Sequence, residues 1–255
     1  MSERKACETV DLPRQSYRYQ GKEKDDNEIK EALQELALQH PRWGFRKMNA
    51  VLHKRKYTWN HKRTYRVYCE MKLNLRVKPK KRLPSREKVI LEQPKQPNKS
   101  WSIDFMSDSL INGKAIRTMN IMDDYNREVL WIEIRHSFPA KQMTKMLDRV
   151  AEWRGYPQQI RSDNGPEFIA KHTADWAKEH GIHWVFIQPG KPNQNGYIER
   201  MNRTYREDVL DAYLLDNLHQ AQELTEDWMM MYNSQRPHEA LNNLTPFEYA
   251  TVAIN

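Results

Sequence analysis

The strongest constraint on the fold is a succession of short apolar segments and amphipathic helical segments in the middle of the chain. Three segments that alternate or run apolar come first, with turn residues between them, and are typical of consecutive strands. Two further apolar runs then alternate with helical segments that carry apolar residues on one face. The expected strands are residues 101–106, 115–123, 129–136, 158–162 and 182–187, and the expected helices are 140–153, 171–180, about 197–214 and 218–233. This order indicates an α/β fold with helices on both faces of one sheet.

The loop and helix at residues 188–200 bring a carboxylate to the start of a helix. Two prolines and two glycines hold the segment 188–196 open, and a helix follows at once. Glu199 lies in the first turn of this helix, where the helix dipole favours a negative charge. The same position suits a carboxylate that holds a cation over the loop.

Two upstream aspartates have the context of partners for Glu199. Asp104 lies inside the first apolar strand, and Asp163 follows the fourth strand, with 35 residues between it and Glu199. Each carboxylate has an ordinary alternative: a strand-edge charge for Asp104, an Asx turn with Gly165 for Asp163, and a surface helix charge for Glu199. Because the chain has 34 acidic residues, the spacing is a weak signal. The strand and helix contexts carry the prediction that all three bind metal.

The charge of the chain is divided unevenly. Residues 1–99 carry 26 Lys and Arg against 12 Asp and Glu, a net of +14, whereas residues 100–255 carry 16 against 22, a net of −6. This asymmetry suggests that the basic part holds a polyanion and that the acidic part holds a metal. Two merely solvated surfaces are the alternative, which is less favoured because +14 over 99 residues exceeds what solubility requires.

The basic part is expected to be helical. Residues 1–20 should form two short helices broken at Leu12-Pro13, and an amphipathic helix should run from the cap cluster 25–27 to Pro41. A second helix contains residues 45–52, and a third begins after Asn60.

The third of these helices carries a basic face. Lys62, Arg63 and Arg66 lie opposite its apolar side. A helix, a short turn and a basic helix form the layout of a helix-turn-helix DNA reader. We therefore favour DNA contacts by these three residues over the alternative of a helical bundle with an ordinary charged face.

Residues 76–99 are expected to be a linker. Residues 78–82 are basic, and Pro84, Pro94 and Pro97 prevent regular structure. Such a run can follow the DNA backbone by charge alone, or serve as a tether, or do both. The expected domains are therefore a helical region at 1–75, the linker at 76–99 and an α/β domain at 100–255.

Cysteine usage and hydropathy exclude several classes of protein. Cys7 and Cys69 form no CxxC pair and no zinc-type spacing, so we expect reduced thiols in a cytosolic setting. No apolar run is as long as the roughly 18 residues that a membrane-spanning helix needs. Residues 1–20 have no apolar signal core.

Taken together, these motifs resemble those of the DDE transposases and retroviral-type integrases. The matching segments are 101–105, 160–168, 188–200, 199–207 and the motif Tyr232-Asn233 with Arg236-Pro237-His238. The chain is most similar, over almost its whole length, to the second-frame protein (OrfB) of bacterial insertion sequences with two overlapping frames. The resemblance implies an RNase H-like mixed five-stranded sheet, in which two parallel strands extend three antiparallel ones, after a small helix-turn-helix-like domain.

The same resemblance implies a transposase that nicks the element end with water and then joins the freed 3′-OH to target DNA. Two Mg²⁺ ions about 4 Å apart, replaceable by Mn²⁺, would be held by carboxylate oxygens. Asp104 would bridge both ions, and Asp163 and Glu199 would each complete one. Without metal, the three carboxylates should repel one another and hold at least one proton with a raised apparent pKa.

The active-site helix and the loop before it should also contact DNA. Arg203 and Arg206 follow Glu199 by four and seven residues and share its helix face, and Lys191 lies in the loop. The alternative for Arg203 is an exposed ion pair with Glu199 or Glu207, which would contribute little.

Several other polar residues near these motifs receive supporting roles. Asp123 and Asp124, at the end of the second strand, are expected to lie near the site and either to be structural or to support the metal ligands, and Glu167 is expected to lie outside the metal site. For the terminal motif Tyr232, Arg236 and His238, packing of the last helices is the favoured role.

Two other functions stay open: a nuclease of the same fold that hydrolyses without joining, and a DNA-binding regulator whose site has decayed. The expected partners are double-stranded DNA (element ends and target), an upstream-frame OrfA-type protein or a fusion to it, and further copies of the chain on DNA. We expect a cytoplasmic, nucleoid-associated protein with no membrane contact.

Overall fold

A computed structural model describes residues 2–19, 25–75, 93–188 and 192–252. The chain divides into two compact units, Met1–Arg76 and Val77–Asn255, each considered by itself below. The predicted linker falls largely on residues 76–92, outside the described residues, as do the loop residues 189–191.

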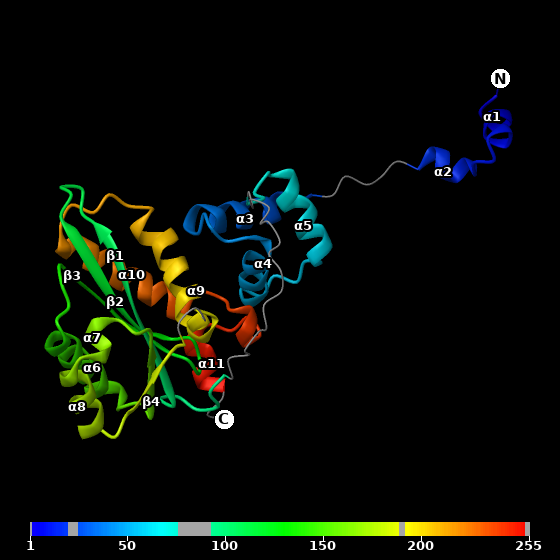
Figure 1. Ribbon diagram of the computed structural model, residues 1–255. Coiled ribbons are helices and arrows are strands. Elements are labelled where there is room, and N and C mark those ends of the chain that lie inside the picture. The colour runs from blue at the N-terminus through cyan, green and yellow to red at the C-terminus, as the bar shows by residue number, and fades with distance from the viewer. Residues whose placement is uncertain (1, 20–24, 76–92, 189–191, 253–255) are drawn as a thin grey trace. The chain divides into compact units, whose positions relative to one another are not determined.

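The first unit is helical, as expected (Figure 1). Its helices are α1 (Glu3–Thr9), α2 (Arg14–Arg18), α3 (Asn27–Gln39), α4 (Phe45–Lys54) and α5 (His61–Glu70). The break between α1 and α2 contains Pro13, which lacks a backbone N–H. Asn60 caps α5, as the sequence predicts, because its side chain accepts a hydrogen bond from the backbone N–H of Lys62.

One apolar face on each of α3, α4 and α5 forms the core of this unit. The fully buried side chains recur at helical spacing on all three helices: Ile29, Leu33, Leu36, Met48, Leu52, Val67 and Tyr68. The periodicity in the sequence therefore predicts both the helices and the faces that they bury.

The second unit contains a mixed five-stranded sheet in the order β3-β2-β1-β4-β5. The strands are β1 (Ser100–Ser109), β2 (Ala115–Asp123), β3 (Val129–Arg135), β4 (Gln159–Ser162) and β5 (His183–Phe186). β1, β2 and β3 pair antiparallel, whereas β4 pairs parallel to β1 and β5 parallel to β4. This arrangement confirms the fold expected from the resemblance, two parallel strands added to an antiparallel meander.

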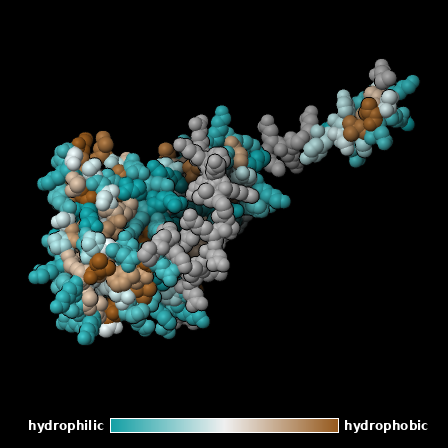
Figure 2. All heavy atoms as spheres, in the orientation of Figure 1, coloured by the Kyte–Doolittle hydropathy of each residue, from teal (hydrophilic) through white to brown (hydrophobic). Residues whose placement is uncertain are grey.

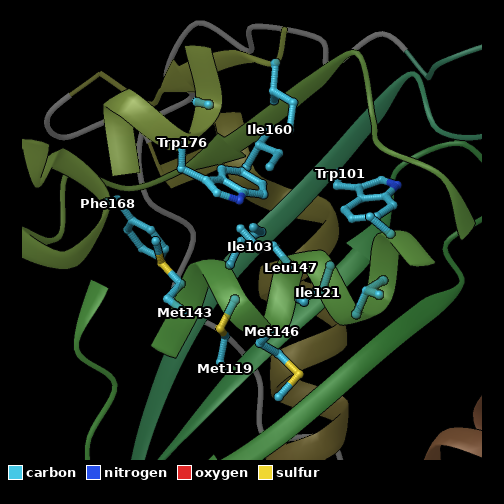
Figure 3. Close-up of a cluster of buried hydrophobic side chains, with 14 of the residues drawn as sticks. Trp101, Ile103, Met119, Ile121, Met143, Met146, Leu147, Ile160, Phe168 and Trp176 are labelled. Atoms are coloured by element: carbon cyan, nitrogen blue, oxygen red, sulfur yellow. The ribbon is translucent and has the colours of Figure 1, made fainter. Parts of the chain in front are cut away.

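Helices cover both faces of the sheet (Figure 1). On one face lie α6 (Ala140–Arg154), the short α7 (Pro166–Ile169) and α8 (Lys171–Glu179). The core beneath them is a continuous apolar cluster that includes Trp101, Ile103, Met119, Ile121, Met143, Leu147, Ile160, Phe168 and Trp176 (Figure 3). Odd-numbered residues of β1 supply this core, so even-numbered ones, Asp104 included, face the other side.

The opposite face carries α9 (Gly196–Tyr205) and α10 (Leu218–Ser234). Their apolar residues form a second core with β2 and β3, which includes Ile116, Met122, Ile132, Ile198, Met201, Tyr205 and Trp228. α10 is held along β3 by polar contacts as well, because the Asn233 amide bonds both the N–H and the C=O of Val129. Consequently α9 is held over the sheet face to which Asp104 belongs.

The expectation of one helix over about 197–214 is wrong in its second half. α9 ends at Tyr205, and the turn Arg206–Leu210 has π-helical geometry, in which the Asp211 N–H reaches the Arg206 carbonyl. The wider turn lets Val209 and Leu210 bury their side chains, a tertiary demand that periodicity cannot show. The short helices α7 and α11 (Pro246–Val252) are also absent from the sequence prediction.

No described helix is both long and apolar enough to span a bilayer. On the visible face, hydrophobic residues lie in small groups separated by hydrophilic ones (Figure 2). Such scattered groups are normal for a folded surface.

Candidate active site

Parallel pairing of β1 and β4 brings two of the predicted carboxylates to neighbouring positions. Ser102 pairs with Arg161; Asp104 lies two residues further along β1, and Asp163 follows Arg161 by two residues, directly after the end of β4. Because side chains alternate across a strand, Asp104 projects to the same face of the sheet as that pair, and Asp163 is close enough for its charge to act on Asp104. Asp104 is half-buried in the centre of the sheet, whereas Asp163 is exposed beyond the end of β4.

Helix α9 crosses this position and supplies the third carboxylate. The Asn202 side-chain N–H donates to an Asp104 carboxylate oxygen at 2.6 Å, which fixes α9 directly above β1. Asn202 is itself oriented by Asn120 on β2, whose amide donates to the Asn202 oxygen at 2.6 Å. Glu199 lies three residues before Asn202 and therefore on the same side of the helix. The three elements thus direct Asp104, Asp163 and Glu199 to one region.

The electrostatics of Asp104 reflect this convergence. Burial raises the pKa of Asp104 to about 7, and the like charges of Asp163 and Glu199 act in the same direction, against the hydrogen bond from Asn202. Burial also raises the pKa of Glu199, opposed by the charge of Arg203. A central carboxyl group that holds a proton near neutral pH fits the repulsion expected of three carboxylates without metal.

The three carboxylates offer the type of ligand that suits the metal implied by the resemblance. Carboxylate oxygens are the hard ligands that Mg²⁺ prefers, and one oxygen on each aspartate already has a donor, Asn202 for Asp104 and the Gly165 N–H for Asp163. In the described parts of the chain, no group of three or more His, Cys, Asp or Glu side chains stands close enough to hold an ion as it is. The chemistry of the donors therefore fits the metal, while a single three-carboxylate cage is not preformed.

Asp123 and Asp124 are occupied by structural contacts. Both are fully buried; Asp124 accepts from the hydroxyls of Ser100 and Ser102 and from Arg161. Asp123 accepts from the backbone N–H groups of Asn98 and Tyr125, and burial raises its pKa to about 6. Their bonds tie the start of β1 to the end of β2.

Glu167 is paired elsewhere. It forms a close ion pair with Arg117 of β2, and the Arg117 guanidinium stacks over Phe105 at 4.4 Å. The pair anchors α7 to the sheet beside the candidate site. Glu167 therefore has a structural partner of its own.

The three basic residues predicted to contact DNA from α5 differ in their surroundings. Arg63 and Arg66 both form ion pairs with Asp26, at 2.7 and 2.5 Å, and Arg66 also pairs with Glu70. Lys62 is exposed on the same helix. DNA contact by these residues stays a prediction, with two of the three already engaged in the fold of the helical unit.

The two arginines predicted to contact DNA from the active-site helix also differ in their surroundings. Arg203 is exposed, whereas Arg206 pairs with Asp108 at 2.9 Å and donates to the Ser107 carbonyl. Lys191 lies outside the described residues.

Sequence reasoning missed Asn202 and Asn120 as parts of the site. Asn202 had a detectable signal, because position i+3 from Glu199 places it on the carboxylate's side of the helix. Asn120 had only a weak one, a fully buried polar residue in an otherwise apolar strand.

Comparison with known proteins places this geometry in a family. The integrase core domain matches residues 94–192 and 180–246, and an HTH-like domain matches residues 24–82. The 31.7 kDa protein of insertion element IS407 from Burkholderia multivorans is 39% identical over 98% of this chain and 91% of its own length. The chain belongs to the integrase-core transposases of bacterial insertion elements.

Further comparisons agree with this assignment. The 39.2 kDa protein of insertion element IS476 from Xanthomonas euvesicatoria is 36% identical to this transposase over 98% of the chain and 72% of that protein. A chain of the simian T-cell lymphotropic virus intasome has the same fold, with a TM-score of 0.55 at 15% identity, over 85% of the transposase and 73% of that chain. The RNase H-like core and the HTH-like region expected for the transposase are thus confirmed, as is its membership of a DNA-binding family.

Proposed function

We propose that this protein cleaves DNA at the ends of its insertion element and joins the freed 3′-OH to target DNA, with Asp104, Asp163 and Glu199 as metal ligands. The observation that carries the proposal is the convergence described above. Adjacent parallel strands present two aspartates on one face, and a helix fixed over that face by Asn202 presents the glutamate. Family membership supports DNA transposition as the setting.

Magnesium is the proposed metal, because the three side chains offer only hard oxygen ligands. When bound, it would offset the negative charge that develops on a phosphodiester under attack and lower the pKa of the attacking hydroxyl group. Asp104 with Asp163, and Asp104 with Glu199, would hold the metal as pairs, and pairs need no three-carboxylate cage. This division agrees with a site in which the charges of Asp163 and Glu199, both exposed, act on the half-buried Asp104.

The protein's own residues have defined parts in the proposed reaction. Asn202 holds the Asp104 carboxylate in place, and Asn120 fixes the orientation of the Asn202 amide. In the first step, water attacks a phosphodiester and releases a 3′-OH; in the second, that hydroxyl attacks a target phosphodiester and displaces another 3′ oxygen. Both displacements need the same surroundings, so one site can serve both.

The protein partners follow from the same proposal. Double-stranded DNA is the substrate in both steps, and copies of the chain would assemble on it. An OrfA-type product of an upstream frame, or a fusion to it, would add recognition of the element ends. An RNase H-fold nuclease without joining activity is the second candidate, because the carboxylates alone support phosphodiester cleavage but not joining.

Alanine substitution of the carboxylates tests the site. Asp104→Ala, Asp163→Ala and Glu199→Ala should each abolish cleavage in Mg²⁺ or Mn²⁺, because each removes a ligand, while DNA binding stays near the wild-type level, because affinity comes mostly from Lys and Arg on phosphates. Strand cleavage and binding of labelled element-end duplex are the measurements.

Asp175→Ala is the matched control, since Asp175 is an exposed carboxylate on α8 that should leave cleavage unchanged. Wild-type cleavage by any of the three site variants would remove that residue from the site.

A further inference from the structure

A cavity of about 290 Å³ lies beside the first turn of α9. It is formed by the β2–β3 turn, α9, α10 and the segment that follows α10. Its lining includes Arg127, Tyr197, Arg200, Tyr232, His238 and Glu239. Two of these, Tyr232 and His238, belong to the terminal motif that the sequence assigns to packing.

Arg127 is an unusual residue at the wall of this cavity. It is 7% exposed, and its guanidinium stacks on the Tyr197 ring, 3.2 Å from the centroid. The guanidinium donates to the Asp124 backbone carbonyl and is hydrogen-bonded with Tyr197, and within the described residues it forms no ion pair with a carboxylate. Burial lowers the pKa of Arg127, which means that the charged form is poorly solvated there. An anion in the cavity would relieve that cost.

Arg200 adds a second cation to the same cavity. It is exposed, and in the described part of the chain its guanidinium has no hydrogen-bond partner and no ion pair, while its backbone carbonyl accepts from the Thr204 hydroxyl. The charges of Arg236, Arg127 and Arg200 all act on the buried Tyr232 hydroxyl, whose pKa burial nevertheless raises to about 12. Glu239 is the single acidic residue among the lining residues named for this cavity. The cavity is therefore a region of net positive charge.

The volume of the cavity limits the size of the anionic ligand that can bind beside the two arginines. At about 30 Å³ for each water molecule, 290 Å³ is room for about ten waters, more than one phosphate group requires. Tyr197 and His238 offer flat surfaces on which a base can stack. A nucleotide stacked in a duplex cannot enter such a recess, whereas an unpaired one can.

We propose that this cavity binds one unpaired nucleotide of the DNA strand next to the reacting phosphodiester, with its phosphate on Arg127 and Arg200 and its base against Tyr197 and His238. This inference rests on the proposed function, since Arg200 directly follows Glu199 in α9. Because consecutive Cα atoms are about 3.8 Å apart, a strand held at the candidate active site would pass close to the base of the Arg200 side chain. The terminal motif then has a ligand-binding role in addition to packing.

Binding measurements on the full chain without divalent metal test the proposal, because no chemistry takes place. The probes are a blunt duplex of element-end sequence and the same duplex with a short single-stranded extension. Arg200→Ala removes an exposed cation, and Ala240→Trp fills the cavity from its exposed rim without a change in charge. Both should weaken binding of the extended duplex about tenfold, within the range for loss of one stacked base, and binding of the blunt duplex much less.

Lys145→Ala is the matched control, since it removes one exposed positive charge from α6, which contributes nothing to this cavity. This substitution should weaken binding of both duplexes equally. Circular dichroism and thermal unfolding establish that each variant is folded.

Equal effects of Arg200→Ala on the two duplexes, or wild-type binding of the extended duplex by Ala240→Trp, would overturn the assignment. Failure of the proposed function has a different signature. In that case wild-type protein would not cleave or join DNA in Mg²⁺, while the preference for the extended duplex, and its loss in the two variants, would remain.

Discussion

At the scale of single residues, Asp104 shows a conflict between stability and proposed function: a metal ligand has to be charged, but a charged Asp104 destabilises the metal-free fold. Its carboxyl group is half-buried on the central strand, and burial together with the charges of Asp163 and Glu199 raises its pKa to about 7. An aspartate in an unfolded chain titrates near 3.9. Stability is therefore lost as pH rises from about 4 to about 7, because the folded state then has to accept a charge that the unfolded state solvates freely.

Asp104→Asn should for this reason stabilise the metal-free protein at pH 8 and have little effect at pH 4. The Asn202 N–H can still donate to the asparagine oxygen, so the hydrogen bond survives. The expected gain in the free energy of unfolding at pH 8 is about 2 kcal/mol, or about 4–8 °C in Tm. Thermal unfolding of both proteins in EDTA at the two pH values measures it.

Asp175→Asn, an exposed carboxylate on α8, provides the comparison and should shift Tm equally at both pH values. Mg²⁺ should raise the Tm of the wild-type protein and leave that of Asp104→Asn unchanged. A Tm difference for Asp104→Asn that is the same at pH 4 and pH 8 would mean that the cost of charging the half-buried Asp104 is not the cause.

At the scale of elements, α9 and the turn that follows it carry Arg203 and Arg206, which helical periodicity places on the same face. Their tertiary contacts, however, differ. Arg203→Ala should lower the slope of log affinity against log salt by about one unit, because an exposed guanidinium is available to a phosphate. Arg206→Ala should lower it by less than half as much, because its charge is already opposed by Asp108. Fluorescence anisotropy of labelled duplex over a range of salt concentrations gives both slopes. A larger effect of Arg206→Ala would show that its pair with Asp108 opens on DNA.

Helix α5 allows the same comparison in the helical unit. Lys62→Ala should reduce the salt slope by about one unit and leave Tm unchanged, because Lys62 is exposed. Arg66→Ala should instead lower Tm, because Asp26, only 7% exposed, then loses one of its two guanidinium partners.

Acid should act on the same contacts. The side-chain hydrogen bonds from Arg66 and Arg63 hold the pKa of Asp26 below its usual range, so their contribution to stability is present above pH 4 and fades as pH falls further. Unchanged Tm in Arg66→Ala would show that the ion pairs are dispensable, and Arg66 would then be as available to DNA as Lys62.

At the scale of the whole molecule, the question is whether the protein joins DNA or only cuts it. Given Mg²⁺, a duplex with a recessed 3′-OH and unrelated plasmid, wild-type protein should yield plasmid covalently linked to the labelled duplex, because one site serves both displacements. Gel analysis of the labelled strand detects the linked product. Nicked plasmid without linked label would identify a nuclease of the same fold instead.

The sequence by itself determined most of the fold, because the fold depends on local patterns. Alternating and running apolar segments are sufficient to place the five strands, and helical periodicity places α3 to α6, α8 and α10 and the faces that they bury. The sequence also singles out Asp104, because burying an acidic side chain inside an apolar strand costs free energy and therefore indicates a functional role. Asp163 and Glu199 follow from a strand end and a helix start.

Only the tertiary structure decided which of the polar residues have partners. Asp26 lies 37 and 40 residues from Arg63 and Arg66, and Asp108 lies 98 from Arg206, so no local pattern reveals these pairs. The Asn120–Asn202–Asp104 chain and the cavity around Arg127 arise in the same way, from segments that meet only when α9 and α10 pack on the sheet. Pairing, burial and pKa depend on distances in space, and those distances are set by packing between elements that are remote in the sequence.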